Sequence, residues 1–241
     1  MRIKAIKNDT RRGIFTNMCI AFISLFVNGF GVYLTIHASV GAAPWDVFNL
    51  GLSKTLGIVY GNASIAVSAL ILLIDVIMRE PIGIAMFIDA VTVGKAVDFF
   101  EWLNVVPVPK NMAGSIVMLV VGLFILGYTQ YFYMNAALGC GPRDTLLVGL
   151  KKRLSKIPIG VISIGLLSLA TFIGWLLGGK VGVGTLVCAF GTGPVMQFAF
   201  RTMRFDADKI THEPLYDSVK IIFAKKKRTN EVDFGEKRAS P

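Results

Sequence analysis

The sequence predicts an all-α, multi-pass membrane protein built from two similar halves. Three observations predict this fold class: a composition too apolar for a soluble domain, long stretches without charge, and a motif that occurs twice. Hydrophobic residues make up 54% of the 241 residues and charged residues 17%, whereas soluble domains carry about 25% charged residues. This balance disfavours a soluble enzyme, a disordered chain and a collagen-like repeat.

The uncharged stretches have the length of membrane-spanning helices. Asp, Glu, Lys and Arg are absent from residues 13–45, 55–74, 111–142, 157–179 and 181–200. A helix needs about 20 apolar residues to cross the hydrocarbon core, and a soluble helix of that length normally has a polar face. The first stretch exceeds the roughly 7–15 apolar residues of a signal peptide, so we expect a retained first span. Alternating segments of the kind found in outer-membrane barrels are missing.

A repeated motif divides the chain into halves. The segment GAAPWDVFNLGLSK at 41–54 recurs as GCGPRDTLLVGLKK at 139–152, which places Pro44 and Asp46 opposite Pro142 and Asp144. With one inserted residue, further glycines continue to coincide. Chance does not supply so many matches at nearly constant spacing, so we predict an internal repeat.

Each half is expected to contain a long span, a glycine-rich loop, a short helix and two more spans. The expected helices are 14–36, 44–56, 61–78 and 82–100 in the first half, and 112–136, 142–154, 158–178 and 181–200 in the second. The predicted organisation is a basic, cytoplasmic N-terminal tail (1–12), a first membrane repeat (13–100), a linker (101–111), a second membrane repeat (112–204) and a cytoplasmic C-terminal tail (205–241).

The short helices leave two topologies open. Thirteen residues reach only about 20 Å as a helix, less than the ~30 Å core, which favours three full spans per half and six in all. If each short helix crosses by recruiting the preceding loop, the count becomes eight. An odd number of crossings per half makes the halves antiparallel, and an even number makes them parallel. Both topologies keep the cluster Lys151–Arg153 and both termini cytoplasmic, as the positive-inside rule prefers.

The repeated carboxylates Asp46 and Asp144 are the first candidates for a site. Each lies two residues after a proline, in the first turn of a short helix, where it can complement the helix dipole or cap free N–H groups. The functional interpretation is that two broken helices face each other and line a solute or ion path, with Arg143 beside Asp144. Both interpretations stay open.

A second set of candidates lies in the expected span 82–100. Asp89, Lys95 and Asp98 are ionisable residues at membrane depth, which are functional candidates by default. Lys95 and Asp98 are three residues apart, so they share a helix face and can neutralise one another. Asp89 falls on roughly the opposite side of the helix, and the alternative for this set is a structural pair that faces the bundle interior.

Other chemistry finds little support in the sequence. Cys19, Cys140 and Cys188 form no metal or disulfide pattern, no nucleophile constellation or phosphate loop is present, and we expect no cofactor, no metal and no enzymatic activity. The basic tails lack interleaved aromatic residues, so nucleic acid is not an expected partner. The expected partners are the lipid bilayer and a small solute or ion, and a homo-oligomer or a membrane partner remains open.

The paired segments GAAPWDVFNLGLSK and GCGPRDTLLVGLKK resemble the bacterial YczE/YitT-type integral membrane proteins over residues 14–204. The resemblance implies a multi-pass protein of the bacterial cytoplasmic membrane. It implies no substrate and transfers no catalytic residue. From the architecture we expect a permease-like protein for a small solute or ion, with a non-transporting scaffold or accessory factor for a membrane complex as the alternative.

Overall fold

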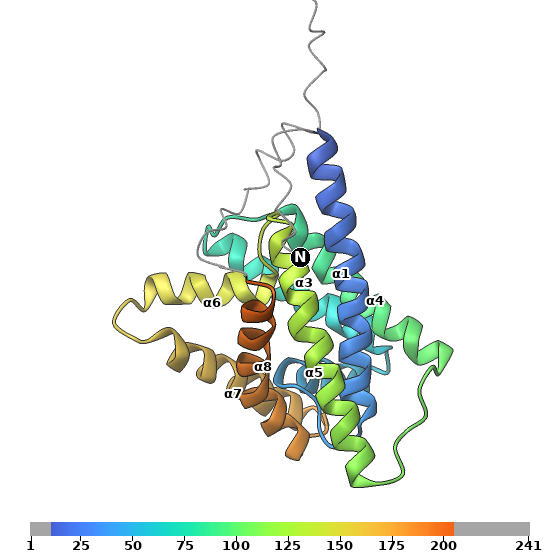
Figure 1. Ribbon diagram of the computed structural model, residues 1–241. Helices are drawn as coiled ribbons and strands as arrows, with labels where there is room; N and C mark the ends of the chain where they lie inside the picture. Colours follow the sequence, from blue (N-terminus) through green and yellow to red (C-terminus); the bar gives the residue numbers. More distant parts are fainter. Residues whose placement is uncertain (1–10, 205–241) are drawn as a thin grey trace, which may run out of the picture.

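The computed structural model describes residues 11–204, and every regular element in that range is an α-helix (Figure 1). The helices are α1 (Arg11–His37), α2 (Pro44–Leu56), α3 (Tyr60–Ile77), α4 (Ile84–Leu103), α5 (Met112–Asn135), α6 (Pro142–Arg153), α7 (Ile159–Leu176) and α8 (Val183–Thr202). The all-α fold class is therefore confirmed. The predicted C-terminal tail and nearly all of the predicted N-terminal tail lie outside the described residues.

Helix ends follow the predicted ranges closely. The largest differences are at α1, which begins at Arg11, and at α4, which runs to Leu103 and so extends into the predicted linker. Within residues 11–204, five helices are long and apolar enough to cross a membrane, namely α1, α3, α5, α7 and α8. Although α4 has 20 residues, it also carries charged side chains at Asp89, Lys95, Asp98 and Glu101. Of the six predicted spans, α4 therefore differs from the other five because it carries several charged side chains.

Helices α1 and α5 lie side by side at the centre of the fold and run in opposite directions (Figure 1). Asn28 of α1 donates to Thr129 of α5 at 2.9 Å. Further along α1, Thr35 lies against Gly122, which is earlier in α5. As the residue number increases along α1, the number of the residue that it contacts in α5 decreases, so the two helices are antiparallel. Small residues at these contacts let the two backbones approach closely, as is usual between membrane helices.

The last helix of each half packs in parallel against the first. Gly29 of α1 lies against Ala96 of α4, and Gly127 of α5 lies against Val195 of α8. Aromatic rings strengthen the α1–α4 contact, since the ring of Phe100 lies 4.9 Å from that of Phe30. These four helices form the central part of the bundle, and a separate buried cluster joins α3 to α6 through Val67, Ile71 and Leu146.

The loop after each long helix crosses to the other half. The backbone N–H of Ala85 at the start of α4 donates to the Leu138 carbonyl at 3.2 Å, and that of Gly184 at the start of α8 donates to the Val40 carbonyl at 2.8 Å. These bonds satisfy two of the backbone groups that a helix N-terminus leaves free. The two halves are therefore interlocked through their loops.

Glycine is required where these loops cross. Gly41 has φ = 109° and Gly139 has φ = 115°, a conformation that other residues rarely adopt. A Cβ at Gly41 would lie 2.6 Å from the Gly182 nitrogen, and one at Gly139 would lie 2.8 Å from the Gly83 Cα. A side chain at either position would strain the backbone and separate the halves.

The short helices pack on the half to which they do not belong. Helix α2 lies on α7 and α6 lies on α3. A proline opens each short helix, where its missing N–H costs nothing and its fixed φ suits the first turn. Helices α7 and α8 contribute the least buried apolar stretches, at 17% and 22%, against 50% in α1. Their outer faces are suited to contact with lipid.

Candidate functional site

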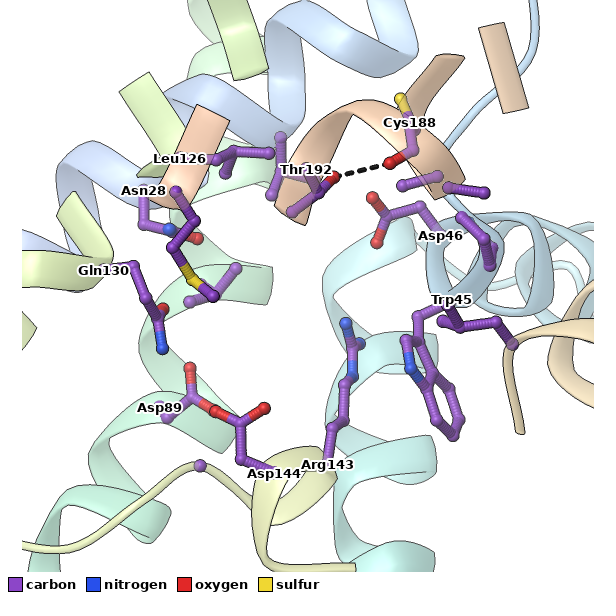
Figure 2. Close-up of a pocket in the computed structure, with 18 of the residues that line it drawn as sticks. Asn28, Trp45, Asp46, Asp89, Leu126, Gln130, Arg143, Asp144, Cys188 and Thr192 are labelled. Carbon is purple, nitrogen blue, oxygen red and sulfur yellow. Dashed lines mark hydrogen bonds between the residues drawn. The ribbon is translucent and has the colours of Figure 1, made fainter. Parts of the chain in front are cut away.

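A cavity of about 510 Å³ lies where the two halves meet (Figure 2), and all eight described helices contribute to its wall. Its volume falls in the roughly 300–1,000 Å³ range of small-molecule sites. The wall is mainly apolar, with a few hydroxyl and amide groups such as those of Ser64, Gln130 and Thr192. Four ionisable side chains interrupt this lining.

These four are Asp46, Asp89, Arg143 and Asp144, all of them predicted site residues (Figure 2). The first turns of α2 and α6 carry Asp46 and the Arg143–Asp144 pair, while α4 carries Asp89. The loops that cross between the halves aim the two short helices at one space. Sequence positions nearly 100 residues apart are thus brought to one cavity.

Asp46 is buried and has protein partners. It is 4% exposed, and its Oδ1 accepts a hydrogen bond from the Tyr60 hydroxyl at 2.8 Å. Tyr60 in turn accepts from Asn49 Nδ2 at 3.2 Å. A buried carboxylate needs such donors because burial without them is costly.

Arg143 stacks its guanidinium on the Trp45 ring, with Cζ 5.3 Å from the ring centre. This cation–π contact joins the two short helices across the cavity. The guanidinium lies close enough to Asp46, Asp89 and Asp144 to attract all three electrostatically. No ion pair within 4.0 Å joins it to any acidic side chain in the described part of the chain.

Asp144 differs from Asp46, which occupies the same position in the other copy of the sequence motif. It is exposed, and the surface that it presents faces the cavity. Figure 2 shows its carboxylate beside that of Asp89. Neither carboxylate accepts a hydrogen bond or forms an ion pair among the described residues, so both remain available to a solute, an ion or water.

Lys95 and Asp98 are not brought to this cavity. Their side chains pair at 3.6 Å, which confirms the predicted neutralisation on one helix face. Asp98 also accepts from the Gly61 backbone N–H at 2.7 Å, and Lys95 donates to Asn62 at 2.7 Å. Lys95 is half exposed, so the expectation of a pair inside the bundle is wrong for its ammonium group. The pair ties α4 to α3.

The capping interpretation of the repeated carboxylates is also corrected. Ala43 and Gly141 occupy the N-cap positions of α2 and α6, and neither residue makes a side-chain capping hydrogen bond. Because each aspartate is already inside the first turn, its carboxylate points into the cavity rather than back to the free N–H groups. The favourable dipole interaction remains.

Two groups near the cavity were not predicted. Tyr60 and Tyr133 are aromatic residues in apolar segments, and nothing in their spacing distinguishes them from core residues. Tyr60 is the donor to Asp46, and Tyr133 is buried with a hydroxyl that has no hydrogen-bond partner. Only the rotation of α3 and α5 about their axes brings the Tyr60 hydroxyl to Asp46 and the Tyr133 hydroxyl to the side of Gly141 where Asp89 lies.

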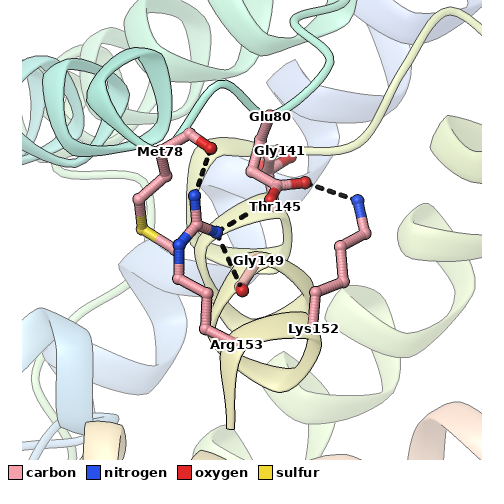
Figure 3. Close-up of polar contacts among 7 residues, drawn as sticks. All are labelled: Met78, Glu80, Gly141, Thr145, Gly149, Lys152 and Arg153. Atoms are coloured by element: carbon pink, nitrogen blue, oxygen red, sulfur yellow. Dashed lines mark hydrogen bonds and ion pairs between the residues drawn. The ribbon is translucent and has the colours of Figure 1, made fainter. Parts of the chain in front are cut away.

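An ionic clamp between the α3–α4 turn and the end of α6 was not predicted either (Figure 3). Glu80, in the turn between α3 and α4, accepts from Lys152 at 2.5 Å and from Arg153 at 3.1 Å, both at the end of α6. Arg153 also donates to the Met78 carbonyl. The Glu80 side chain is 5% exposed, which makes it an unusually well-enclosed partner for two half-exposed cations.

The clamp changes the titration of its carboxylate. The Lys152 hydrogen bond, with further help from Arg153, holds the pKa of Glu80 below its ordinary value of 4.5, against the opposite effect of burial. Glu80 is therefore ionised at neutral pH, and the clamp is intact there.

Fold and cavity together define the class: a multi-pass α-helical membrane protein with a charged internal cavity. Residues 15–201 match a family described as "Family of unknown function (DUF6198)", and the chain belongs to this family. The chain is 31% identical over 180 residues to YczE, an uncharacterised membrane protein of Bacillus subtilis. The alignment covers 74% of this chain and 82% of the relative. This confirms the predicted resemblance to YczE-type proteins.

Two further relatives are similar over comparable lengths. A Haemophilus influenzae protein is 25% identical over 184 residues, which is 76% of this chain and 83% of the relative. The Bacillus subtilis protein YyaS is 27% identical over 176 residues, or 70% of this chain and 86% of the relative. No solved structure matches the chain.

Proposed function

We propose that this protein is a permease-like protein of the bacterial inner membrane that moves a small solute or ion, and that it is not an enzyme. The observation that carries the proposal is the cavity between the two halves, which holds four ionisable side chains inside an otherwise apolar helical bundle. Ionisable groups at such depth are costly and usually line a path for a solute, an ion or a proton.

An inverted repeat is the second part of the proposal. Contacts at corresponding positions support it: the bond from Ala85 to Leu138 corresponds to the bond from Gly184 to Val40, and the contact of Gly139 with Gly83 corresponds to that of Gly41 with Gly182. The antiparallel packing of α1 and α5 supports an odd number of crossings per half. Transporters that alternate between two openings often use two such inverted halves around a central site.

The six-span topology with cytoplasmic termini can be tested by chemical labelling. In a variant lacking Cys19, Cys140 and Cys188, single cysteines would replace Lys54 and Lys180. We expect an impermeant thiol reagent to label both from outside the cell. Labelling of position 54 only from the cytoplasm would contradict six spans and favour eight.

Solute binding and transport can be tested with purified protein. A ligand that binds only the folded state raises the apparent melting temperature, so metabolites and ions that do so would be taken into uptake assays with reconstituted vesicles. The proposal expects uptake that depends on Asp144. Binding without uptake, or no stabilising solute together with a co-purifying membrane complex, would favour the scaffold or accessory alternative.

A further inference from the structure

The cavity contains more negative than positive charge. Asp46, Asp89 and Asp144 provide three carboxylates, whereas Arg143 provides one guanidinium. Asp46 already accepts a hydrogen bond from Tyr60 at 2.8 Å, so the cavity carboxylates without a hydrogen-bond donor among the described residues are Asp89 and Asp144. Two adjacent carboxylates in a low-dielectric space repel one another and favour a shared cation.

A third group points to the same place. The Tyr133 side chain is 3% exposed, and its hydroxyl has no hydrogen-bond partner. Both this hydroxyl and Asp89 Oδ2 lie beside Gly141, because a Cβ there would be 3.8 Å from the Tyr133 oxygen and 2.7 Å from Asp89 Oδ2. A buried hydroxyl without a partner costs stability, so its placement beside Gly141 of the cavity wall and near the free Asp89 carboxylate indicates a role in ligand binding there.

Gly141 makes this arrangement sterically feasible. Any larger residue there would force Asp89 away from the position that it occupies. The corresponding residue in the other half is Ala43, and the residue corresponding to Asp89 is Cys188. Around Asp46, the position equivalent to Asp89 is therefore held by Cys188, and no second carboxylate pairs with Asp46 there.

We propose that Asp89 and Asp144, with the Tyr133 hydroxyl beside Asp89, form a subsite for the ammonium group of a small organic amine. The ammonium would donate to the two carboxylates, and the apolar part of the amine would occupy the remaining cavity. A primary ammonium has three N–H donors, and the two carboxylates offer four acceptor oxygens. The substrate class rests on the proposed function, but the subsite itself is defined by binding.

The first test measures the melting temperature of the purified full chain with butylammonium chloride, 1-butanol and sodium butyrate at equal concentration and ionic strength. Butylammonium should raise the melting temperature, whereas the neutral alcohol and the anion should not. Equal stabilisation by 1-butanol would overturn the proposal, and so would stronger stabilisation by butyrate, because that result would assign the site to Arg143.

Variants locate the subsite. Asp89→Asn and Asp144→Asn should each weaken butylammonium binding by about tenfold or more, since each removes a charged hydrogen-bond acceptor. Asp98→Asn is the matched control, because Asp98 lies on the same helix as Asp89 but outside the cavity. Unchanged binding in both cavity variants would contradict the proposal.

A fluorescence titration of the unmutated protein with butylammonium tests the subsite even if the variants fold poorly. Trp45 lines the cavity, so butylammonium should change the tryptophan fluorescence of the unmutated protein, and 1-butanol should not. The absence of both a fluorescence and a melting response would overturn the subsite. If amines bind but are not taken up by reconstituted vesicles, the subsite stands and the transport proposal fails. If an anion is transported and amines do not bind, the transport proposal stands and the subsite fails.

Discussion

Asp46 and Asp144 occupy equivalent positions in the repeated motif, yet the structure gives them different surroundings. Asp46 is buried and accepts from Tyr60, whereas Asp144 faces the cavity without a hydrogen bond from the described residues. Part of the difference arises within one half, because Tyr60 is replaced by Ile159 at the corresponding position of the other half. The rest comes from the opposite half: Cys188 faces the first site where Asp89 faces the second. Equal motifs thus acquire unequal chemistry because each is completed by helices from elsewhere in the chain.

The ends of the short helices show the same divergence. At the end of α2, the Thr55 hydroxyl donates to the Leu177 carbonyl at 3.0 Å. At the corresponding end of α6, Arg153 donates to the Met78 carbonyl and Glu80 adds the ionic clamp. One closing contact is neutral and the other depends on charge, so the two ends should respond differently to pH and salt.

The largest predicted difference between the two sites is in stability. Asp46→Ala leaves the Tyr60 hydroxyl without its acceptor and should destabilise the protein by about 2 kcal/mol. Asp144→Ala removes no protein partner and should change stability by less than about 0.5 kcal/mol. Thermal or denaturant unfolding in one detergent measures both. Equal losses would show that the two carboxylates are structurally equivalent after all.

The clamp should show the next largest effect. Glu80→Gln should cost about 1 kcal/mol at pH 7, a value limited by the half-exposed cations. Because the folded pKa of Glu80 is lowered, its contribution is complete above the ordinary value of 4.5 and is lost as pH falls through the folded pKa. The difference in melting temperature between the unmutated protein and Glu80→Gln should therefore disappear only at acidic pH.

Thr55→Val provides the matched comparison at the other end. It should cost about 0.5 kcal/mol, since it removes one hydroxyl donor that the Leu177 and Gly51 carbonyls share. This cost should not vary between pH 4 and pH 8, as no titrating group is removed. A pH-dependent loss in Thr55→Val, or a pH-independent one in Glu80→Gln, would remove the proposed distinction between the ends.

Exchanging the residues before the two prolines should have a smaller effect on stability and should act mainly on binding. Gly141→Ala should leave stability nearly unchanged, since the new methyl group would meet only Asp89 Oδ2, the end of a side chain that can rotate. It should weaken butylammonium binding by about 1 kcal/mol, roughly fivefold, because Asp89 must leave its preferred rotamer. Ala43→Gly is the control and should not alter the titration. Unaltered binding in Gly141→Ala would place the amine elsewhere.

The smallest effect is predicted for the charged pair that does not line the cavity. Lys95→Gln breaks a half-exposed contact to Asp98, and such pairs contribute only about 0.3–0.5 kcal/mol. Amine binding should be unaffected. A marked loss of binding or uptake in Lys95→Gln would extend the functional site beyond the cavity.

Much of the fold could be predicted from the sequence. A backbone in lipid must satisfy its own hydrogen bonds, so long uncharged segments become helices irrespective of their partners. Prolines at positions 44 and 142 and the glycine-rich loops before them mark helix starts locally, and both short helices begin where predicted. The candidate site was predicted in part, since Asp46, Asp89, Arg143 and Asp144 share one cavity, while Lys95 and Asp98 do not.

The remaining features depended on tertiary structure. The spans are apolar on nearly every side, so the sequence shows neither which face of a helix points inward nor how far one helix slides along another. Those two variables decide that Tyr60 reaches Asp46, that Tyr133 lies beside Asp89, and that Glu80 meets the end of α6. The sequence by itself determined the helices and their order, because these depend on local hydrogen bonding and length. Only the packing of the helices decided which charges are satisfied and which are left for a ligand.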